Sequence, residues 1–255
     1  MPDAAYTRSY YLTVCGGHEL WRASRGARLP RRLSRVLELA AIAPGERVLD
    51  IGAGRGELAR AAAALGARVL ALDSSLDAVA LSRQTLGASR GASGPLLACA
   101  TRLPVGDGSL DVVLMTDVVE HLTPAELAAA LREARRALAP GGRLVVHTLP
   151  NLWYYRFGYP LYRLVMRARG TTLPRDPRAR VAGMREMHVN EQSPRSLRAA
   201  LGGAGLAARV WLEPADVGEH EPSAFVRGVE RFLASTPPFR LVFCDDIFAV
   251  ARRAG

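Results

Sequence analysis

Residues 48–59, VLDIGAGRGELA, are the stretch that decides the fold of this chain. Apolar residues run into Asp50, three glycines then alternate with small or polar residues, and an apolar, alanine-rich run follows. This order predicts a strand, a tight turn and a helix. Gly52, Gly54 and Gly56 tolerate positive φ and let a ligand lie against the backbone, beside the free N–H groups of a helix N-terminus. The stretch therefore predicts a site for a nucleotide-like molecule.

The spacing of the glycines separates two kinds of cofactor. Dinucleotides use a G-x-G-x-x-G turn, whereas other adenosine-containing cofactors use G-x-G-x-G, which is the spacing found here. Asp73 ends the next apolar run, RVLALD, about 20 residues further on, where an acceptor for ribose hydroxyls is expected. The turn by itself leaves both kinds of cofactor open.

Four segments extend this pattern: VLDIGAGRGELA, ALDSS, LPVGDGSLDVVLMTDVVEHL and ALAPGGRLVVHTLPN. Together they closely resemble the class I S-adenosylmethionine-dependent methyltransferases. The resemblance covers residues 40–150 closely and residues 190–255 loosely. It implies an α/β fold of Rossmann-like type, with a seven-stranded, mostly parallel sheet, helices on both faces and the last strand antiparallel. It also implies S-adenosylmethionine as the cofactor.

The resemblance also assigns cofactor contacts. The stretch from Asp50 to Gly56 is expected to hold the methionine part, Asp73 the ribose hydroxyls, and Thr116 with Asp117 the sulfonium end. Many relatives carry an Asp that contacts adenine, but Cys99 stands at that position here. The full set of expected cofactor residues is Asp50, Gly52, Ala53, Gly54, Gly56, Asp73, Ser74, Ala100, Thr101, Thr116 and Asp117.

Composition predicts a single soluble domain in the cytoplasm. The chain has 255 residues, of which 49% are hydrophobic, enough for one sizeable core. No apolar run reaches the roughly 20 residues of a membrane span, and the first residues lack the apolar core of a signal peptide. Cys15, Cys99 and Cys244 lie far apart and are expected to be reduced thiols.

The net charge of +10 comes entirely from arginine, because the chain contains no lysine. This usage is typical of a GC-rich genome, so the total charge says little about partners. Its location is more informative: residues 151–185 hold eight Arg and one Asp, and residues 1–35 hold seven Arg and two acids. The rest of the chain is slightly acidic. No feature indicates an oligomeric state.

Strands alternate with helices through most of the chain. We expect strands at 47–51, 68–72, 96–99, 111–116, 143–148, 208–212 and 239–251. Helices are expected at 58–65, after Ser74 or Ser75, and at 124–138, 194–201 and 225–233, with a loop at 87–94. Such alternation predicts a parallel sheet with its ligands at the carboxyl ends of the strands. Asp50, Asp73, Cys99, Thr116 and Thr148 all fall at these ends.

Two further segments flank this core. Residues 1–43 are expected to form an N-terminal helical cap, in which Tyr6, Tyr10 and Tyr11 either close the pocket or pack as ordinary surface residues. Residues 44–150 form the cofactor-binding core, and residues 191–255 its C-terminal part. The aromatic and basic insertion at 151–190 has three interpretations: a helical lid over an aromatic or lipidic acceptor, an amphipathic contact with a membrane, or plain packing. Nucleic-acid binding is disfavoured because no known module is present.

The sulfonium leaving group is already activated, so the enzyme mainly aligns the reactants and excludes water. A hydroxyl acceptor must also lose its proton. The candidate bases are His121, His188 and His147, the last of which is also consistent with a structural histidine inside a strand. His18 and His220 lie in segments that the pattern does not assign.

Asp117-x-x-Glu120-His121, followed by a distant His188, is similar to a divalent-ion motif of ubiquinone-pathway O-methyltransferases and small-RNA ribose methyltransferases. This chain has Asp where the motif begins with Glu. If a helix follows Thr116, Asp117, Glu120 and His121 share one face and, with His188, can hold Mg²⁺, Mn²⁺ or Zn²⁺. Metal-free relatives carry a similar segment, so both possibilities stay open.

These observations predict a methyltransferase that acts on a hydroxyl oxygen of a small-molecule acceptor such as a natural product, a quinone or a lipid-like compound. Transfer to nitrogen and an inactive cofactor-binding protein are the alternatives. An NAD-dependent enzyme fits less well, because the glycine spacing and the chain ending do not match a dehydrogenase. An RNA methyltransferase fits less well, because no known nucleic-acid-binding module is present.

Overall fold

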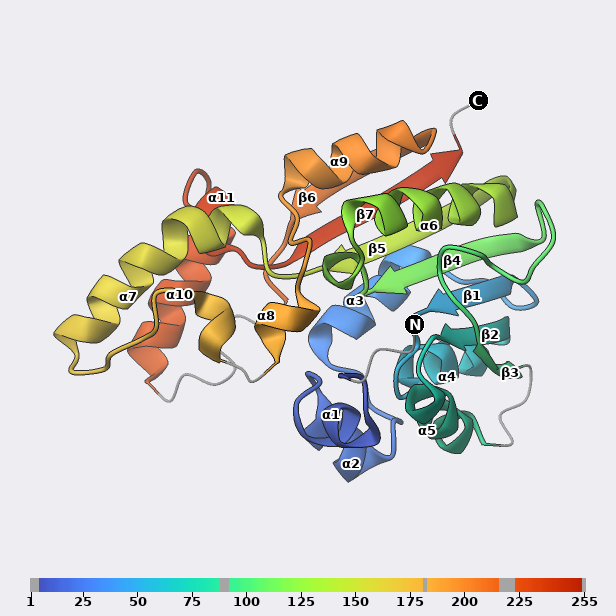
Figure 1. The fold of residues 1–255 in the computed structure, drawn as a ribbon, viewed down its shortest axis with the longest axis horizontal. Coiled ribbons are helices and arrows are strands. Elements are labelled where there is room, and N and C mark those ends of the chain that lie inside the picture. The colour runs from blue at the N-terminus through green and yellow to red at the C-terminus, as the bar shows by residue number, and fades with distance from the viewer. Residues whose placement is uncertain (1–4, 88–91, 181–182, 216–222, 254–255) are drawn as a thin grey trace.

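The core of the molecule is a seven-stranded sheet with the order β3-β2-β1-β4-β5-β7-β6 (Figure 1). The computed structural model describes residues 5–87, 92–180, 183–215 and 223–253. The strands are β1 (Arg47–Ile51), β2 (Arg68–Asp73), β3 (Ala92–Leu97), β4 (Leu110–Thr116), β5 (Leu138–Thr148), β6 (Leu206–Leu212) and β7 (Ile247–Arg253). Strands β1 to β5 pair in parallel, and β7 runs antiparallel to both β5 and β6. The expected Rossmann-like fold is confirmed.

Helices cover both faces of the sheet because successive residues of each strand point to opposite sides. On one face, Leu49, Val113 and Val146 pack with residues of α6 (Pro124–Ala137) and α9 (Pro194–Gly203). On the other, Val48, Val112 and Val145 pack with α3 (Arg31–Ala40), α4 (Glu57–Ala64) and Leu86 of α5 (Leu76–Leu86). The strands are apolar on both faces, which explains why they read as continuous apolar runs.

Several strand boundaries differ from expectation, most clearly in β3, β5 and β7. β3 ends at Leu97, so Cys99 lies after the strand and not within it. β5 begins at Leu138 and includes the Pro-Gly-Gly turn expected before it, with an irregular register beside β4. The last strand was expected from residue 239, but Arg240–Phe243 form the short helix α11 and β7 begins only at Ile247. Of the loop expected at 87–94, residues 88–91 lie outside the described residues and residues 92–94 belong to β3, so that part of the prediction was wrong; His220 also lies outside the described residues.

A helical lobe extends beyond the carboxyl edge of the sheet (Figure 1). It contains a π-turn (Tyr154–Gly158), α7 (Tyr159–Ala168), a 3-10 turn (Pro177–Arg180) and α8 (Met184–Met187), with α10 (Ala224–Ser235) and α11 from the C-terminal part of the chain. A Cβ on Gly158 would lie 2.0 Å from the Val242 carbonyl oxygen, so this glycine allows the close contact with α11. The lobe therefore joins two segments that the sequence separates by the core strand β6.

A second helical element contains α1 (Arg8–Thr13) and α2 (His18–Ser24), which precede α3. Tyr11 packs there against Ala78 and Leu81 of α5, with Tyr6 and Tyr10 at the edge of the cluster. No described helix is both long and apolar enough to cross a membrane.

Candidate functional site

The glycine turn after β1 adopts the conformation that its sequence predicts. Gly52, Gly54 and Gly56 have φ values of 70°, 53° and 83°. A Cβ on Gly52 would lie 2.3 Å from Val118 Cγ2, and one on Gly56 would lie 2.6 Å from Ser82 Oγ. A side chain at either position is therefore excluded both by the backbone conformation and by space.

Two buried carboxyl groups face this turn. Asp73 is 7% exposed, and its oxygens accept hydrogen bonds from the backbone N–H groups of Gly54 and Ser75, both at 2.9 Å. Burial raises the pKa of Asp73, and these hydrogen bonds oppose the rise. Asp50 is 2% exposed, and its Oδ2 has no hydrogen-bond partner among the described residues. Burial, followed by repulsion from Glu57 and Asp73, raises the pKa of Asp50 to about 8.

We expect Asp50 to make the cofactor-free protein less stable as the pH rises. In the unfolded chain Asp50 loses its proton near its ordinary pKa of 3.8, whereas in the folded protein it keeps it to about pH 8. Its stabilising contribution is therefore full below about pH 4 and is lost as the pH rises to about 8.

Denaturant titrations of the parent and of Asp50→Asn between pH 5 and 7 measure this contribution. Asp50→Asn should reduce the fall in unfolding free energy by up to about 1.4 kcal/mol per pH unit. Parallel curves for the two proteins would show that Asp50 ionises normally.

One cavity of about 1260 Å³ lies at the carboxyl edge of the sheet, between the N-terminal helices and the lobe. It exceeds the 300 to 1,000 Å³ typical of a single-ligand pocket and so has room for a cofactor and an acceptor. Its lining includes these residues expected from the sequence: Asp50, Gly52, Ala53, Gly54, Asp73, Ser74, Ala100, Thr116, Asp117, Glu120, His121 and His188. Thr116 Oγ1 is buried and has no described partner, so it also offers a polar contact at the cavity.

Three expected residues do not line the cavity. Gly56 lies behind the turn, where it begins α4 and packs on Ser82. Thr101 turns its hydroxyl to the Cys99 sulfur at 3.1 Å, and Cys99 itself lines the cavity. His147 is 0% exposed inside β5. The structure therefore does not bring these three residues to the cavity, as cofactor contact or catalysis was expected to require.

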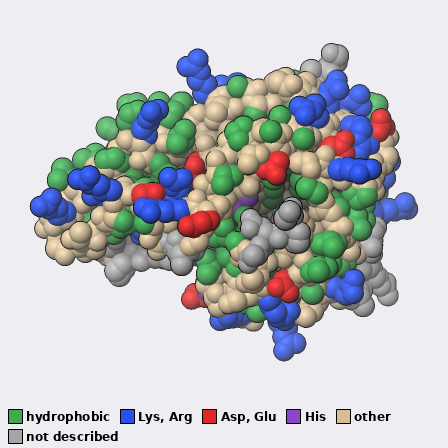
Figure 2. Space-filling view, in the orientation of Figure 1, with side chains coloured by type: hydrophobic (Ala, Val, Ile, Leu, Met, Phe, Trp, Pro, Cys, Tyr) green, Lys and Arg blue, Asp and Glu red, His purple; other side chains and the backbone are tan. Residues whose placement is uncertain are grey.

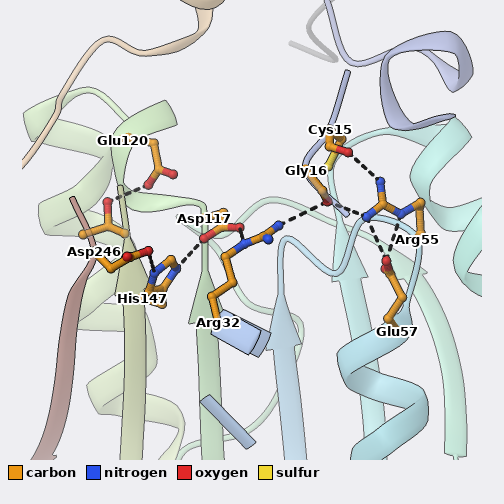
Figure 3. Close-up of polar contacts among 10 residues, drawn as sticks. Cys15, Gly16, Arg32, Arg55, Glu57, Asp117, Glu120, His147 and Asp246 are labelled. Atoms are coloured by element: carbon orange, nitrogen blue, oxygen red, sulfur yellow. Dashed lines mark hydrogen bonds and ion pairs between the residues drawn. The ribbon is translucent and has the colours of Figure 1, made fainter. Parts of the chain in front are cut away.

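Arg55, inside the glycine turn, ties the turn to the N-terminal segment (Figure 3). Its guanidinium donates to the carbonyl oxygens of Tyr11 at 2.7 Å, Cys15 at 3.1 Å and Gly16 at 2.8 Å. The same group pairs with Glu57 at 2.8 Å, and both side chains are almost fully buried. The segment that carries Tyr6, Tyr10 and Tyr11 is therefore fixed over the cofactor turn, and all three tyrosines line the cavity.

A row of four charged side chains crosses the floor of the site (Figure 3). Arg32 Nε of α3 lies 2.8 Å from Asp117 Oδ2, and Asp117 Oδ1 lies 2.5 Å from His147 Nδ1. His147 Nε2 lies 3.2 Å from Asp246 Oδ1. Burial alone would lower the pKa of His147, but Asp117 and Asp246 outweigh it and raise this pKa to about 10. Burial alone would raise the pKa of Asp117, but Arg32 and His147 hold it well below its usual range.

The condition for a shared helix face, a helix directly after Thr116, is not met. Asp117 has φ of 55°, a conformation that Asp tolerates, and only Val119–His121 form a 3-10 turn. Asp117 consequently points to Arg32 and His147, away from the two residues with which it was expected to share a helix face.

Glu120, His121 and His188 form a cluster of one carboxyl group and two imidazoles, which does not include Asp117. One ligand atom from each lies within 4.8 Å of the others. Glu120 accepts a 2.7 Å hydrogen bond from Thr148, and burial with the nearby Asp117 raises its pKa to about 8. His188 Nδ1 has no described partner, and burial with the nearby His121 lowers the pKa of His188 to about 4. His188 is therefore neutral at pH 7.

Contacts from distant segments complete this cluster. His121 Nδ1 lies 3.0 Å from the Met187 carbonyl oxygen and 2.8 Å from the Tyr6 hydroxyl. Asp245 also lines the cavity, with Oδ1 unpaired among the described residues, and burial raises its pKa to about 8. The sequence signal for Asp245 was an acidic pair before an apolar run, but nothing in the pattern marked Arg32 or Arg55.

Comparisons with known proteins agree with this geometry. Residues 49–146 match the family described as "Methyltransferase domain". A demethylmenaquinone methyltransferase of Clavibacter sepedonicus is 34% identical over 63% of this chain and 60% of that protein. Another, from Mycobacterium sp. strain KMS, is 36% identical over 66% of this chain and 67% of that protein.

Among solved structures, geranyl diphosphate C-methyltransferase from Streptomyces coelicolor has the same fold, with a TM-score of 0.60. It is 16% identical, and the match covers 88% of this chain and 78% of that one. Its structure contains Mg²⁺, geranyl diphosphate and S-adenosyl-L-homocysteine.

The fold and the cavity beside the glycine turn define a Rossmann-like α/β protein with a cofactor-sized site at the carboxyl edge of its sheet. The chain belongs to the class I S-adenosylmethionine-dependent methyltransferases, and S-adenosylmethionine is accordingly its cofactor. The match spans 53–60% of the length of three of the curated relatives, the Clavibacter protein among them.

Proposed function

We propose that this chain transfers a methyl group from S-adenosylmethionine to a hydroxyl oxygen of a small aromatic or lipid-like acceptor. The observation that carries this proposal is a single cavity with two different ends. One end is formed by the glycine turn with Asp50, Asp73 and Thr116, and the other by apolar side chains of the lobe. Glu120, His121 and His188 lie in the lining as well.

The residues of the first end fit the cofactor. Asp50 and Thr116 each have a buried oxygen without a described partner, and Asp73 lies where ribose hydroxyls are expected. Gly52 and Gly54 leave the backbone open to a ligand. When bound, S-adenosylmethionine supplies an activated methyl group, so no nucleophile of the enzyme is required. The protein's part is to bind, to exclude water and to handle the acceptor's proton.

His188 is our candidate for the group that takes this proton. It is neutral at pH 7 because burial and His121 lower its pKa, and its Nδ1 is unpaired among the described residues. A base must be unprotonated and within reach of the acceptor to act. His121, held by Met187 and Tyr6, is the second candidate.

A divalent ion is a further part of this proposal. Two imidazoles and one carboxylate are the donor set of catalytic zinc sites that keep a position open for a substrate. Glu120, His121 and His188 would hold the ion, without Asp117, and the ion would lower the pKa of a bound hydroxyl. The group is smaller than the one expected from the sequence, and it favours Zn²⁺ over Mg²⁺ because Mg²⁺ prefers oxygen ligands.

The second end supports an acceptor with an extended apolar part. Its lining combines Leu161, Tyr162, Val165 and Met166 of α7 with Val226, Val229 and Leu233 of α10, and with Tyr154 and Phe243. We therefore propose that the lid expected at residues 151–190 also includes α10 and α11, which lie outside that segment and pack with α7 around this end of the cavity. The relatives named as demethylmenaquinone methyltransferases favour a quinone-type acceptor. A relative from Rubrivivax gelatinosus named as a ubiquinone/menaquinone biosynthesis C-methyltransferase makes methylation of a carbon the second candidate reaction. We place the protein in the cytoplasm, because its three described cysteines are free thiols.

Asp73→Ala should weaken binding of S-adenosylhomocysteine at least tenfold, measured by calorimetry. A carboxylate that accepts from hydroxyl groups contributes about 1.5 to 3 kcal/mol, and its replacement also frees the Gly54 N–H. Asp107→Ala, an exposed acid remote from the turn, is the control and should bind like the parent. Equal affinity of Asp73→Ala and the parent would contradict the assignment of the cofactor site.

Methyl transfer itself is tested with S-adenosylmethionine and a reduced naphthoquinone. We expect the mass of the product to rise by one methyl group, and fragmentation distinguishes oxygen from ring carbon. Cofactor binding without turnover on any hydroxylated aromatic acceptor would instead support the inactive cofactor-binding protein.

A further inference from the structure

The helical lobe exposes apolar side chains of α7 and α10 as continuous stripes. On α7, the exposed residues Leu161, Leu164 and Val165 have the i, i+3, i+4 spacing of one helix face. On α10, Phe225, Val229 and Phe232 have the spacing i, i+4, i+7. An amphipathic helix normally turns its apolar face toward the protein core, whereas α7 and α10 expose theirs.

The stripes begin inside the cavity and continue outside it. Leu161, Val165 and Val229 line the cavity, whereas Leu164 (64% exposed), Phe225 (79%) and Phe232 (58%) are exposed and lie outside its lining. Phe157, Phe239 and Leu241, on the neighbouring turns, are also exposed by 44–58%. Contiguous exposed apolar side chains around a cavity indicate an interaction surface, because single ones are normal but clusters are rare.

Arginines surround these apolar residues. Residues 151–187 and 223–243, which contain the lobe, together hold eleven Arg against Asp176, Glu186 and Glu230. Arg156, Arg167 and Arg231 are exposed, and none of them pairs with a described carboxylate. Figure 2 shows basic and hydrophobic side chains next to each other over the lobe, at the left of the molecule. A guanidinium group matches phosphate geometry, and its stem can lie along apolar surface.

We propose that the outer surface of this lobe, formed by α7, α10 and α11, docks on an anionic phospholipid membrane. The exposed leucine and phenylalanine side chains enter the acyl boundary, and the arginines contact lipid phosphates. Because the stripes lead into the cavity, an apolar acceptor enters from the lipid without crossing water. The docking itself does not depend on the methyl-transfer chemistry, whereas the route of the acceptor rests on the proposed function.

Co-sedimentation with vesicles tests the docking. We expect the parent to bind phosphatidylglycerol vesicles and to bind phosphatidylcholine vesicles weakly. Phe225→Ser/Phe232→Ser should lower the partition coefficient about tenfold or more, because each phenylalanine loses its apolar burial in the lipid. Leu65→Ser, an exposed leucine at the end of α4, is the matched control and should bind like the parent.

The charge contribution is tested separately. Arg156→Gln/Arg167→Gln/Arg231→Gln should reduce binding to anionic vesicles at least tenfold, and high salt should have the same effect. Arg83→Gln/Arg132→Gln/Arg195→Gln removes the same charge elsewhere and should change binding much less. Equal losses in the two triple variants would overturn a specific docking surface.

A second copy of the chain is the competing occupant. Sedimentation velocity without lipid should show a monomer for the parent. A dimer that dissociates in Phe225→Ser/Phe232→Ser, or no binding to anionic vesicles, would overturn the proposal. Calorimetry with S-adenosylhomocysteine should give the same affinity for the lobe variants and the parent, so failure of docking is distinguishable from failure of the cofactor site.

Discussion

Asp117→Ala is expected to lower the free energy of unfolding by about 3–5 kcal/mol at pH 7, the range for removing one partner of a buried ion pair. Asp117 lies between Arg32 and His147, and the His147 side chain is 0% exposed. Without Asp117, the buried imidazolium keeps only the longer contact with Asp246. The loss comes from leaving a charge buried with too few partners, and it is measured by denaturant titration.

Two comparisons make this result specific. Asp107→Ala removes an exposed partner of Arg136 and should cost less than about 1 kcal/mol. The double variant His147→Gln/Asp117→Asn should lose less unfolding free energy than the sum of the losses of His147→Gln and Asp117→Asn measured singly, because the charge and its partner are removed together. Additive losses would mean that the two side chains act independently.

The same pair predicts how stability varies with pH. The pKa of His147 rises from 6.5 to about 10 in the folded protein, so its stabilising contribution is full below about pH 6.5. That contribution is lost as the pH rises through about 10. Asp117→Ala should therefore flatten the decrease in stability between pH 7 and pH 9.

His188→Ala is expected to lower turnover by about 100-fold or more and to leave the affinity for S-adenosylhomocysteine nearly unchanged. General acid–base catalysis contributes about 10² to 10⁴, and His188 has an unpaired nitrogen among the described residues and a lowered pKa that keeps it unprotonated at pH 7. Turnover is measured as S-adenosylhomocysteine formed with a reduced naphthoquinone. His18→Ala is the control, because His18 does not line the cavity.

A chelator separates the two roles available to His188. If Glu120, His121 and His188 hold an ion, a chelator should abolish turnover, and Zn²⁺ should restore it, while cofactor binding persists. If His188 acts as a base without an ion, the chelator should have no effect. Full activity in chelator together with a harmless His188→Ala would reject both roles and leave catalysis to alignment alone.

Much of the fold follows from local features that the sequence shows directly. The glycine turn, β1 and the start of α6 depend on residues near one another in the chain, so apolar runs, glycines and Pro124 indicate them reliably. The position of Asp73 could also be predicted from the sequence, because this residue ends the strand next to β1. Parallel strands bring their carboxyl ends to one edge, which is why these residues share a cavity.

The helical lobe could not be predicted from such local features. Residues 239–246 are apolar enough to resemble a strand, but the chain forms α11 there and packs it on the π-turn at 154–158. Contacts between segments so far apart in the chain leave no periodic signal. The exposed stripe on α10 is equally invisible, since an amphipathic pattern predicts a helix without saying which face is covered.

The sequence by itself determined the glycine turn and the order of strands and helices in the core, because these depend on local order, and it indicated the cofactor through the resemblance of four segments to a known family. Only the tertiary structure decided the role of Asp117 and His147. Arg32 lies 85 residues from Asp117, and Asp246 lies 99 residues from His147. A buried charge is stable only with its partners, and the fold selects those partners from distant parts of the chain.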